Sequence, residues 1–418
     1  MSTNVKNQLK ARYSLRRLFL EHPADLQAEI GAQRGPFVEE FAARCRRHSW
    51  TIKILCQDEE LPKNLLSAFS LRGLACWLSG PGKAYLFSDA AQLRALAGGR
   101  HFISSTEAAF AQELRVFLDH QERDEFILDT PRCKMILGGP ALIMGILNVT
   151  PDSFFDGGKY TAHEQAIAQG LKLAEEGADI IDIGGESTRP KGAYGEGAQP
   201  VPAEEELARV LPVIQALSSL IDVPISIDTY KAHVAEAALQ AGAGMVNDIS
   251  GLLFDPKMAE VVARHHAPLV LMHLKGTPQN MQQNPAYENL MDEIYLHLHR
   301  QMQVALQAGI PRELIIIDPG IGFGKSLQNN YEILRRLPEL RGLGSALLVG
   351  PSRKSFLGKL LNLPPEQRFE GTAAASAVAA MKGAHILRVH DVAKIKRVVQ
   401  ITDLINGRLE SAMPGAAS

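Results

Sequence analysis

The sequence predicts an α/β protein, a (β/α)8 TIM barrel preceded by a small α/β N-terminal domain. From Leu137 onward, short aliphatic or β-branched runs alternate with helical patterns of roughly 10 to 20 residues, which is typical of a parallel α/β fold. Eight such units over about 270 residues match a closed barrel. A doubly wound open sheet is the structural alternative, although no GxGxxG motif opens the first helix. Strands are expected at Leu142–Leu147, Ile180–Ile183, Ile225–Ile227, Met245–Val246, Leu269–Met272, Leu314–Ile317, Ala346–Val349 and Ile386–Val389.

Residues 1–130 are expected to form the small α/β domain, because helical patterns there alternate with a few short apolar runs. Pro36 is a favourable first residue for a helix that continues through Arg47. Thr106–His120 carries apolar residues at helical spacing. This region contains no phosphate loop, paired carboxylates or metal-ligand cluster, so the sequence assigns it no role. Strands are expected there at Thr51–Cys56, Leu74–Leu78 and Ala84–Phe87.

The boundary between the two domains is expected after the charged stretch Gln121–Glu125, where Pro131 marks a linker. The barrel domain then spans residues 137–410, and residues 411–418 are expected to be a flexible tail. A chain of 418 residues has a suitable length for two domains.

Composition and charge describe an ordinary globular protein, with 46% hydrophobic and 22% charged residues. The formal net charge of −2 provides no general attraction to nucleic acid or to an acidic membrane, so neither is an expected partner. The opening MSTNVKNQLKARYS lacks the apolar run of a signal peptide. The Cys45-x-x-His48 pair has no second pair that would complete a zinc site. The four cysteines are expected to be reduced thiols of a cytoplasmic protein, and they are Cys45, Cys56, Cys76 and Cys133.

Polar residues follow every predicted barrel strand, whereas no comparable set precedes the strands. A single polar residue at a strand end is usually a helix cap or a turn former. A barrel, however, gathers all eight strand ends on one rim, where active sites lie. The eight sets together therefore predict a site. In strand order they are Asn148; Glu186, Ser187, Thr188 and Arg189; Asp228; Asn247 and Asp248; His273; Asp318; Ser352, Arg353 and Lys354; and His390, with Arg388 inside the last strand.

The residue types at this rim fit two kinds of ligand group. Asp228, Asn247 and Asp318 offer acceptors and an amide to the amino and ring N–H groups of a flat heterocycle. Lys354 suits either a heterocycle or a phosphate, and His273 is as compatible with a structural role as with a functional one. The donors expected around a phosphate or pyrophosphate are Asn148, Thr188, Arg189, Arg388 and His390.

Two further segments have competing interpretations. The glycine-rich DPGIGFGK (Asp318–Lys325) fits neither GxGxxG nor GxxxxGK[ST], so it is interpreted as a tight βα loop that brings Phe323 beneath a ligand. The run of small residues Ala373–Ala380 indicates a closely packed helix face or a subunit interface.

Five segments together resemble the motif set of dihydropteroate synthase, in the order of that family. They are MGILNVTPDSF (Met144–Phe154), GGESTRP (Gly184–Pro190), DPGIGFGK, GPSRKSFLG (Gly350–Gly358) and RVHDV (Arg388–Val392). The resemblance covers all eight βα units. It implies a transferase of folate biosynthesis and a sulfonamide target, which joins 6-hydroxymethyl-7,8-dihydropterin pyrophosphate to p-aminobenzoate and releases pyrophosphate. A homodimer is also implied.

The resemblance further implies a role for each matching residue. The pterin would be held by Asp228, Asn247, Asp318 and Lys354, with Met272 and Phe323 as apolar walls. The pyrophosphate would be held by Asn148, Arg388 and His390, with magnesium at Asn148. The p-aminobenzoate side would be shaped by Thr188, Arg189, Pro190, Ser355 and Phe154, and Asp156 in the first loop would help to order the closed complex. Catalytic roles would fall to Asn148, Asp156, Lys354, Arg388 and His390.

The sequence departs from the family pattern at two loops, and two other functions compete with the family's reaction. Phe155 stands where the family often has a small residue, and the loop Lys191–Pro202 is longer than usual. Residues 1–130 lack the pyrophosphokinase signature that is sometimes fused to this enzyme. A methyltetrahydrofolate-dependent methyltransferase would also bind a pterin in a barrel, but it needs no pyrophosphate site. A catalytically silent paralogue that acts as an interaction module would not need polar groups on every strand end.

Overall fold

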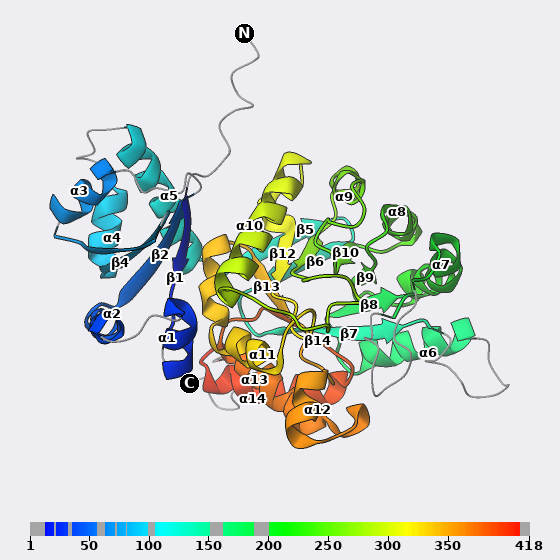
Figure 1. The fold of residues 1–418 in the computed structure, drawn as a ribbon. Coiled ribbons are helices and arrows are strands. Elements are labelled where there is room, and N and C mark those ends of the chain that lie inside the picture. Colours follow the sequence, from blue (N-terminus) through cyan, green and yellow to red (C-terminus); the bar gives the residue numbers. More distant parts are fainter. Residues whose placement is uncertain are drawn as a thin grey trace, which may run out of the picture. The chain divides into compact units, whose positions relative to one another are not determined.

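The computed structural model describes residues 13–20, 22–31, 36–56, 63–71, 73–80, 82–98, 105–150, 162–187 and 200–409 (Figure 1). The chain divides into two compact units. The first consists of Met1–Arg123 together with Glu288–Leu296 and Pro338–Gly344, and the second consists of Asp124–Tyr287, His297–Leu337 and Ser345–Ser418. Within the residues described, no helix is both long enough and apolar enough to cross a membrane.

The first unit contains a four-stranded antiparallel sheet with strand order β1-β2-β4-β3. Its strands are β1 (Tyr13–Arg17), β2 (Trp50–Cys56), β3 (Ala75–Gly80) and β4 (Lys83–Ser88). The helices are α1 (Pro23–Ile30), α2 (Pro36–Arg47), α3 (Lys63–Leu71), α4 (Ala90–Ala97) and α5 (Ser105–Glu122). The small α/β fold expected from the sequence is therefore present.

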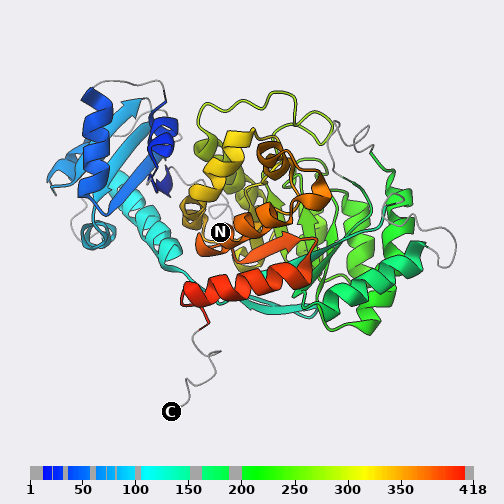
Figure 2. The ribbon, with the colours of Figure 1, turned by 90° about the horizontal axis from the view of Figure 1, so that it is seen from below.

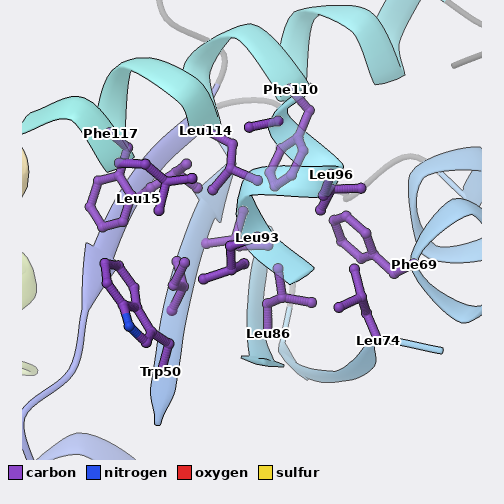
Figure 3. Packing of buried hydrophobic residues seen from close by; sticks show 14 of the residues in the cluster. Leu15, Trp50, Phe69, Leu74, Leu86, Leu93, Leu96, Phe110, Leu114 and Phe117 are labelled. Carbon is purple, nitrogen blue, oxygen red and sulfur yellow. The ribbon is translucent and has the colours of Figure 1, made fainter. Parts of the chain in front are cut away.

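Apolar side chains are buried on both faces of this sheet. On one face, Leu86 of β4 packs in a cluster with Phe110 and Leu114 of α5 (Figure 3). On the other face, Phe41 of α2 contacts Phe87 edge to face, with ring centroids 5.6 Å apart. The edge strand β3 pairs with β4 out of regular register between Leu78 and Gly80, which interrupts the ladder at the end of the strand.

A cluster of charged side chains is buried inside the first unit. The Arg16 guanidinium is fully buried and donates to Glu29 at 3.0 Å, to Asp292 at 2.5 Å and to Glu339. Lys53 also pairs with Glu29 at 2.6 Å and with Asp292 at 2.5 Å. Each of these carboxylates therefore has a cationic partner. Since the loss of one partner leaves a buried charge unpaired, this cluster is sensitive to any change in its members.

The second unit contains a closed barrel of parallel strands in the order β10-β11-β12-β13-β14-β7-β8-β9, surrounded by helices (Figures 1 and 2). The strands are β7 (Leu142–Asn148), β8 (Ile180–Gly184), β9 (Ile225–Asp228), β10 (Met245–Asp248), β11 (Leu269–Met272), β12 (Ile315–Asp318), β13 (Ala346–Val349) and β14 (Ile386–Val389). The (β/α)8 barrel is thus confirmed, because β14 pairs with β7 and leaves no edge strand.

Helices follow each barrel strand along the chain. They are α6 (Ala162–Glu175), α7 (Ala203–Leu220), α8 (Ala232–Ala241), α9 (Met258–His265), α10 (Leu290–Gln307), α11 (Leu327–Arg335), α12 (Ser355–Leu361), α13 (Phe369–Met381) and α14 (Val392–Ile405), with short 3-10 turns η2 (Arg312–Leu314), η3 (Leu337–Leu343) and η4 (Pro365–Gln367). In α13, Ala375, Ser376 and Ala379 are buried while Val378 and Met381 are exposed, so one face of the small-residue run is closely packed.

The stretch after Gln121 is more ordered than the expected linker. Helix α5 continues through Glu122, and a hairpin of β5 (Phe126–Thr130) and β6 (Cys133–Leu137) follows, with Pro131 in its turn. The stretch that the sequence indicated as a linker thus contains the end of a helix, the boundary between the two units and a regular hairpin. The reason is an alternating pattern, in which Phe126, Leu128 and Thr130 are buried and the residues between them are exposed.

Candidate active site

Arg388 joins three strands of the barrel at their carboxyl ends. Its Nε donates to Asp182 Oδ2 at 2.6 Å, and its Nη2 donates to Asp228 Oδ2 at 2.6 Å. Asn247 donates its side-chain amide to the same Asp182 oxygen at 3.0 Å. These residues come from β14, β8, β9 and β10, so the closed barrel places three of the expected site residues in one hydrogen-bonded group.

Asp182 is the member of this group that the sequence analysis missed. Its side chain is fully buried in β8, and its Oδ1 has no hydrogen-bond partner among the residues that the structure describes. The available signal was a carboxylate within the apolar run Ile180–Gly184, since a buried charge needs a partner of opposite charge. Arg388 and Asn247 are those partners.

The charges in this group influence one another strongly. Burial raises the pKa of Asp228 to about 7, although the nearby Arg388 guanidinium acts in the opposite direction. Burial alone would lower the pKa of Arg388. The negative charges of Asp182 and Asp228 together have the larger effect, so the pKa of Arg388 is raised above its usual value. Arg388 therefore remains a cation, while Asp228 can change its protonation state near neutral pH.

Asp318 and Lys354 lie on the same rim, at the end of β12 and in the loop after β13. Asp318 ends β12, and its Oδ1 accepts the backbone N–H of Gly320 at 2.6 Å. Lys354 precedes α12, and its Nζ donates to the Ile321 carbonyl at 2.6 Å. Burial lowers the pKa of Lys354 to about 7, against the attraction of Asp318. Burial likewise raises the pKa of Asp318. This part of the rim therefore offers an acceptor, Asp318, and a donor, Lys354, whose pKa lies near neutrality.

An apolar cluster lies beside these polar groups. Met272, at the end of β11, is buried in it, and Phe323 packs against it from the loop after β12. The Lys354 ammonium lies 4.0 Å from the centroid of the Phe323 ring. A flat ligand that contacts Lys354 would therefore also meet Phe323. The remaining members of the cluster are Ile249, Leu274 and Met281, with Tyr230 at its margin.

His390 follows β14 and is oriented by Ser352. The Ser352 Oγ accepts the backbone N–H of His390 at 3.2 Å and lies 2.9 Å from its Nδ1. The Ser352 hydroxyl can then donate to Nδ1, which places the imidazole proton on Nε2. Arg353, by contrast, is held by Asp391 in a two-point ion pair at 2.8 and 3.1 Å.

A known protein family and several of its members are similar to this chain. The family model described as pterin binding enzyme matches residues 144–390. A dihydropteroate synthase from Synechocystis is 49% identical over 269 residues, which cover 64% of this chain and 91% of the relative. A Bacillus subtilis dihydropteroate synthase is 46% identical and covers 63% of this chain and 87% of the relative.

Solved structures agree. A Yersinia pestis dihydropteroate synthase in complex with a sulfonamide drug has a TM-score of 0.63 and 43% identity, and covers 67% of this chain and 99% of that chain. A Xanthomonas albilineans dihydropteroate synthase in complex with 7,8-dihydropteroate has a TM-score of 0.57 and 42% identity, and covers 66% of this chain and 95% of that chain. The chain belongs to the dihydropteroate synthase family. It is accordingly a transferase of folate biosynthesis.

Two expected residues of this family site lie at the margins of the group described above. Asn148 ends β7, is half-buried and stands in register with Gly184 of β8. Ser355 is the first residue of α12 and is also half-buried. Among the residues described, no group of three or more His, Cys, Asp or Glu side chains could hold a metal ion. A magnesium ion bound through the Asn148 amide oxygen would therefore take its other ligands from substrate phosphate and water, which is a usual arrangement for this ion.

Five expected residues lie outside the described part of the chain, and they are Phe154, Asp156, Thr188, Arg189 and Pro190. Phe155 and residues 191–199, where the sequence departs from the family pattern, also lie outside the described part of the chain. A hydrogen bond connects the described residues on either side of 188–199, in which Glu186 Oε2 accepts the backbone N–H of Val201 at 3.3 Å. Glu186 itself accepts from the Tyr230 hydroxyl at 2.8 Å and from Lys231 at 2.5 Å.

Proposed function

We propose that this chain condenses 6-hydroxymethyl-7,8-dihydropterin pyrophosphate with p-aminobenzoate at the barrel rim, giving 7,8-dihydropteroate and pyrophosphate. The observation that carries the proposal is the Arg388 group. A cation for a phosphate leaving group is hydrogen-bonded to Asp228, which is an acceptor suited to a pterin. This pairing of an anion site with a heterocycle site is what the proposed substrate requires, and it lies in a chain of the dihydropteroate synthase family.

The pterin half would bind between Asp228, Asn247, Asp318 and Lys354, with Met272 and Phe323 as its apolar walls. The carboxylates of the half-buried Asp228 and the buried Asp318 suit the amino and ring N–H groups of a pterin, because hydrogen bonds to charged acceptors are strong where water is largely excluded. Asn247 is held by Asp182, so its carbonyl oxygen keeps a defined direction. The apolar cluster beside Lys354 would exclude water from the ring face.

The pyrophosphate half would bind to Arg388, His390 and Asn148. Arg388 stays protonated because Asp182 and Asp228 stabilise its charge. His390 would present an Nε2–H donor, since Ser352 occupies its Nδ1. A magnesium ion bound at Asn148 would supply additional positive charge next to the phosphate oxygens.

The p-aminobenzoate half would lie against Phe154, Thr188, Arg189, Pro190 and Ser355, and Asp156 would help to order the closed complex. Glu186 and Val201 bring together the described ends of the chain on either side of residues 188–199. A sulfonamide binds the Yersinia pestis relative. We accordingly propose that sulfonamides compete with p-aminobenzoate here.

The reaction would proceed by departure of pyrophosphate before the amine attacks. The C–O bond breaks, its electron pair leaves with the pyrophosphate oxygen, and the methylene cation that remains is conjugated with the electron-rich pterin ring. Arg388 and His390 stabilise the developing negative charge from fixed positions. The amine nitrogen of p-aminobenzoate then forms the new C–N bond and releases its proton to water. No covalent bond to the enzyme is required.

A homodimer and a cytoplasmic location complete the proposal. The outward faces of α13 and α14 carry exposed apolar side chains, which a second copy of the chain would cover, and these are Val378, Met381, Ile401 and Ile405. The four cysteines are all free, which fits a reducing compartment.

The test is a pyrophosphate-release assay with the purified full chain, magnesium and both substrates. Release that requires both substrates, together with formation of dihydropteroate, is expected. The Arg388→Ala variant should lose this activity, while an Arg408→Ala variant, which changes an arginine beyond the last barrel helix, should keep it. Release of pyrophosphate without p-aminobenzoate, or no release at all, would overturn the proposal.

A further inference from the structure

A lysine is enclosed beneath the apolar wall of the site. Lys325 lies at the end of the loop after β12, and only 3% of it is exposed. Its Nζ lies 2.8 Å from His273 Nδ1, 3.1 Å from the His273 carbonyl and 2.8 Å from the Phe323 carbonyl. These three contacts enclose the amine, and burial lowers its pKa well below the usual value for lysine.

The contacts of Lys325 join two loops that carry site residues. His273 directly follows Met272, which ends β11, whereas Phe323 belongs to the loop that follows Asp318. Lys325 donates to the carbonyls of His273 and Phe323 and is hydrogen-bonded to His273 Nδ1, so it connects the end of β11 to the loop after β12. Burial lowers the pKa of His273 well below its usual value, and Lys325 lowers it further, so the ring stays neutral.

Other contacts between the same two loops show that they are closely fitted. Gln282 donates to the Gly322 carbonyl at 2.8 Å, and the Tyr287 hydroxyl donates to the Gly324 carbonyl at 2.6 Å. Gly320 has a φ of +69°, and a Cβ at this position would lie 2.0 Å from the His273 carbonyl oxygen. The backbones therefore approach so closely that a side chain would not fit between them.

The groups that this loop holds in place belong to the pterin side of the proposed site. The Ile321 carbonyl accepts from Lys354, and the Phe323 ring lies under the Lys354 ammonium. The guanidinium of Arg388, in contrast, is held by Asp182 and Asp228. A disturbance at Lys325 should therefore reach Phe323 and Lys354 before it reaches the pyrophosphate side.

We propose that Lys325, with His273 as its hydrogen-bond partner, is a positioning residue for the pterin half of the substrate. It fixes the loop that presents Phe323 and the Ile321 carbonyl. This inference rests on the proposed synthase function and deepens it. It also resolves the two interpretations of His273, which acts through Lys325 and not by contact with substrate.

The experiment compares Lys325→Met with Lys359→Met, which removes an exposed lysine from α12. Steady-state kinetics of the full chain would give both Michaelis constants, and calorimetry would give the affinity for 6-hydroxymethylpterin alone. For Lys325→Met we expect the KM of the pterin pyrophosphate to rise about tenfold or more while that of p-aminobenzoate stays within about twofold. Lys359→Met should match the wild type in every measurement.

Two further results decide the inference. Equal changes in both Michaelis constants, or none, in a folded Lys325→Met protein would overturn it. If Lys325→Met does not fold, Tyr287→Phe removes a single hydrogen bond to the same loop, and its pterin KM alone should rise. An unchanged ratio of Michaelis constants in that variant would equally overturn the inference. An inactive wild type would instead refute the synthase function, so the two failures are distinguishable.

Discussion

Arg388 and Asp228 form an ion pair of 2.6 Å between the last strand of the barrel and the third. The arginine is proposed for the pyrophosphate and the carboxylate for the pterin, so the pair connects the two halves of one substrate. A pterin that binds Asp228 must share this oxygen with the guanidinium or move it. Changes at either residue are therefore expected to affect both halves of the site.

Arg388→Ala should weaken binding of 6-hydroxymethylpterin as well as turnover. The substitution leaves Asp182 fully buried without its cation, and the loss of one partner of a buried pair costs about 3–5 kcal/mol. Calorimetry with the bare pterin and urea unfolding would measure the two effects, with Arg388→Lys as the variant that keeps a charge. A fall in kcat with unchanged pterin affinity and unchanged stability would show that the ion pair is unimportant for the pterin half.

His390→Ala should lower turnover without changing the affinity for the bare pterin. His390 contacts Ser352 and not the Asp228 group in the hydrogen bonds described above, and its proposed role is to donate to the leaving group. Loss of one such donor typically costs on the order of 10²-fold in kcat. Single-turnover kinetics and pterin calorimetry together test this, since weaker binding of the phosphate-free pterin would place His390 on the other side of the site.

Pterin binding should be strongest near neutral pH and fall on both sides. The pKa of Asp228 is raised to about 7, so below this value the carboxylate takes a proton and loses an acceptor. The pKa of Lys354 is lowered to about 7, so above this value the amine loses its charge. Pterin affinity measured between about pH 5 and pH 9 should decrease at both low and high pH. The two apparent pKa values of this profile belong to the coupled groups together. Lys354→Arg, which stays protonated, should lack the decrease at high pH; if that decrease persists, Lys354 is not its source.

A chain that begins at Arg132 should keep measurable synthase activity but be less stable. All barrel strands and all described site residues belong to the second unit. The shortened chain, however, would contain Asp292 and Glu339 without Arg16 and Lys53, at a cost of a few kcal/mol as for other broken buried pairs.

Melting curves beside steady-state kinetics would test this expectation. Arg16→Met in the full chain is the matched variant, because it removes the same cation and keeps every other residue of the unit. A shortened protein that is folded by circular dichroism yet inactive would contradict the prediction. Such a result would mean that residues 1–131 contribute directly to the reaction.

The sequence was most informative where burial alone decides the structure. The barrel strands have nearly the expected bounds, because parallel strands buried on both faces read as apolar runs that end at polar residues. Asp228, Asn247, Asp318, Lys354 and Arg388 were predicted as site residues on the same basis, because polar residues at or just after an apolar run are visible in the sequence.

What the sequence could not show were partners that lie far apart along the chain. Asp182 is explained by Arg388, which is 206 positions away, and Arg16 by Glu339, which is 323 positions away. The charged stretch and Pro131 indicated a linker, although the alternation of buried residues in Phe126–Thr130 was the signal of a hairpin. Long-range pairing and short alternating strands are therefore the features that need a structure.

The irregular pairing of β3 has a consequence for how the protein behaves in concentrated solution. This strand is at the edge of its sheet, where a continuous row of unpaired N–H and C=O groups could recruit a strand from another molecule. The register shift between Leu78 and Gly80 bends that row, so an incoming strand could not match it over its whole length. Concentration during purification should therefore not lead to strand-to-strand aggregation along β3.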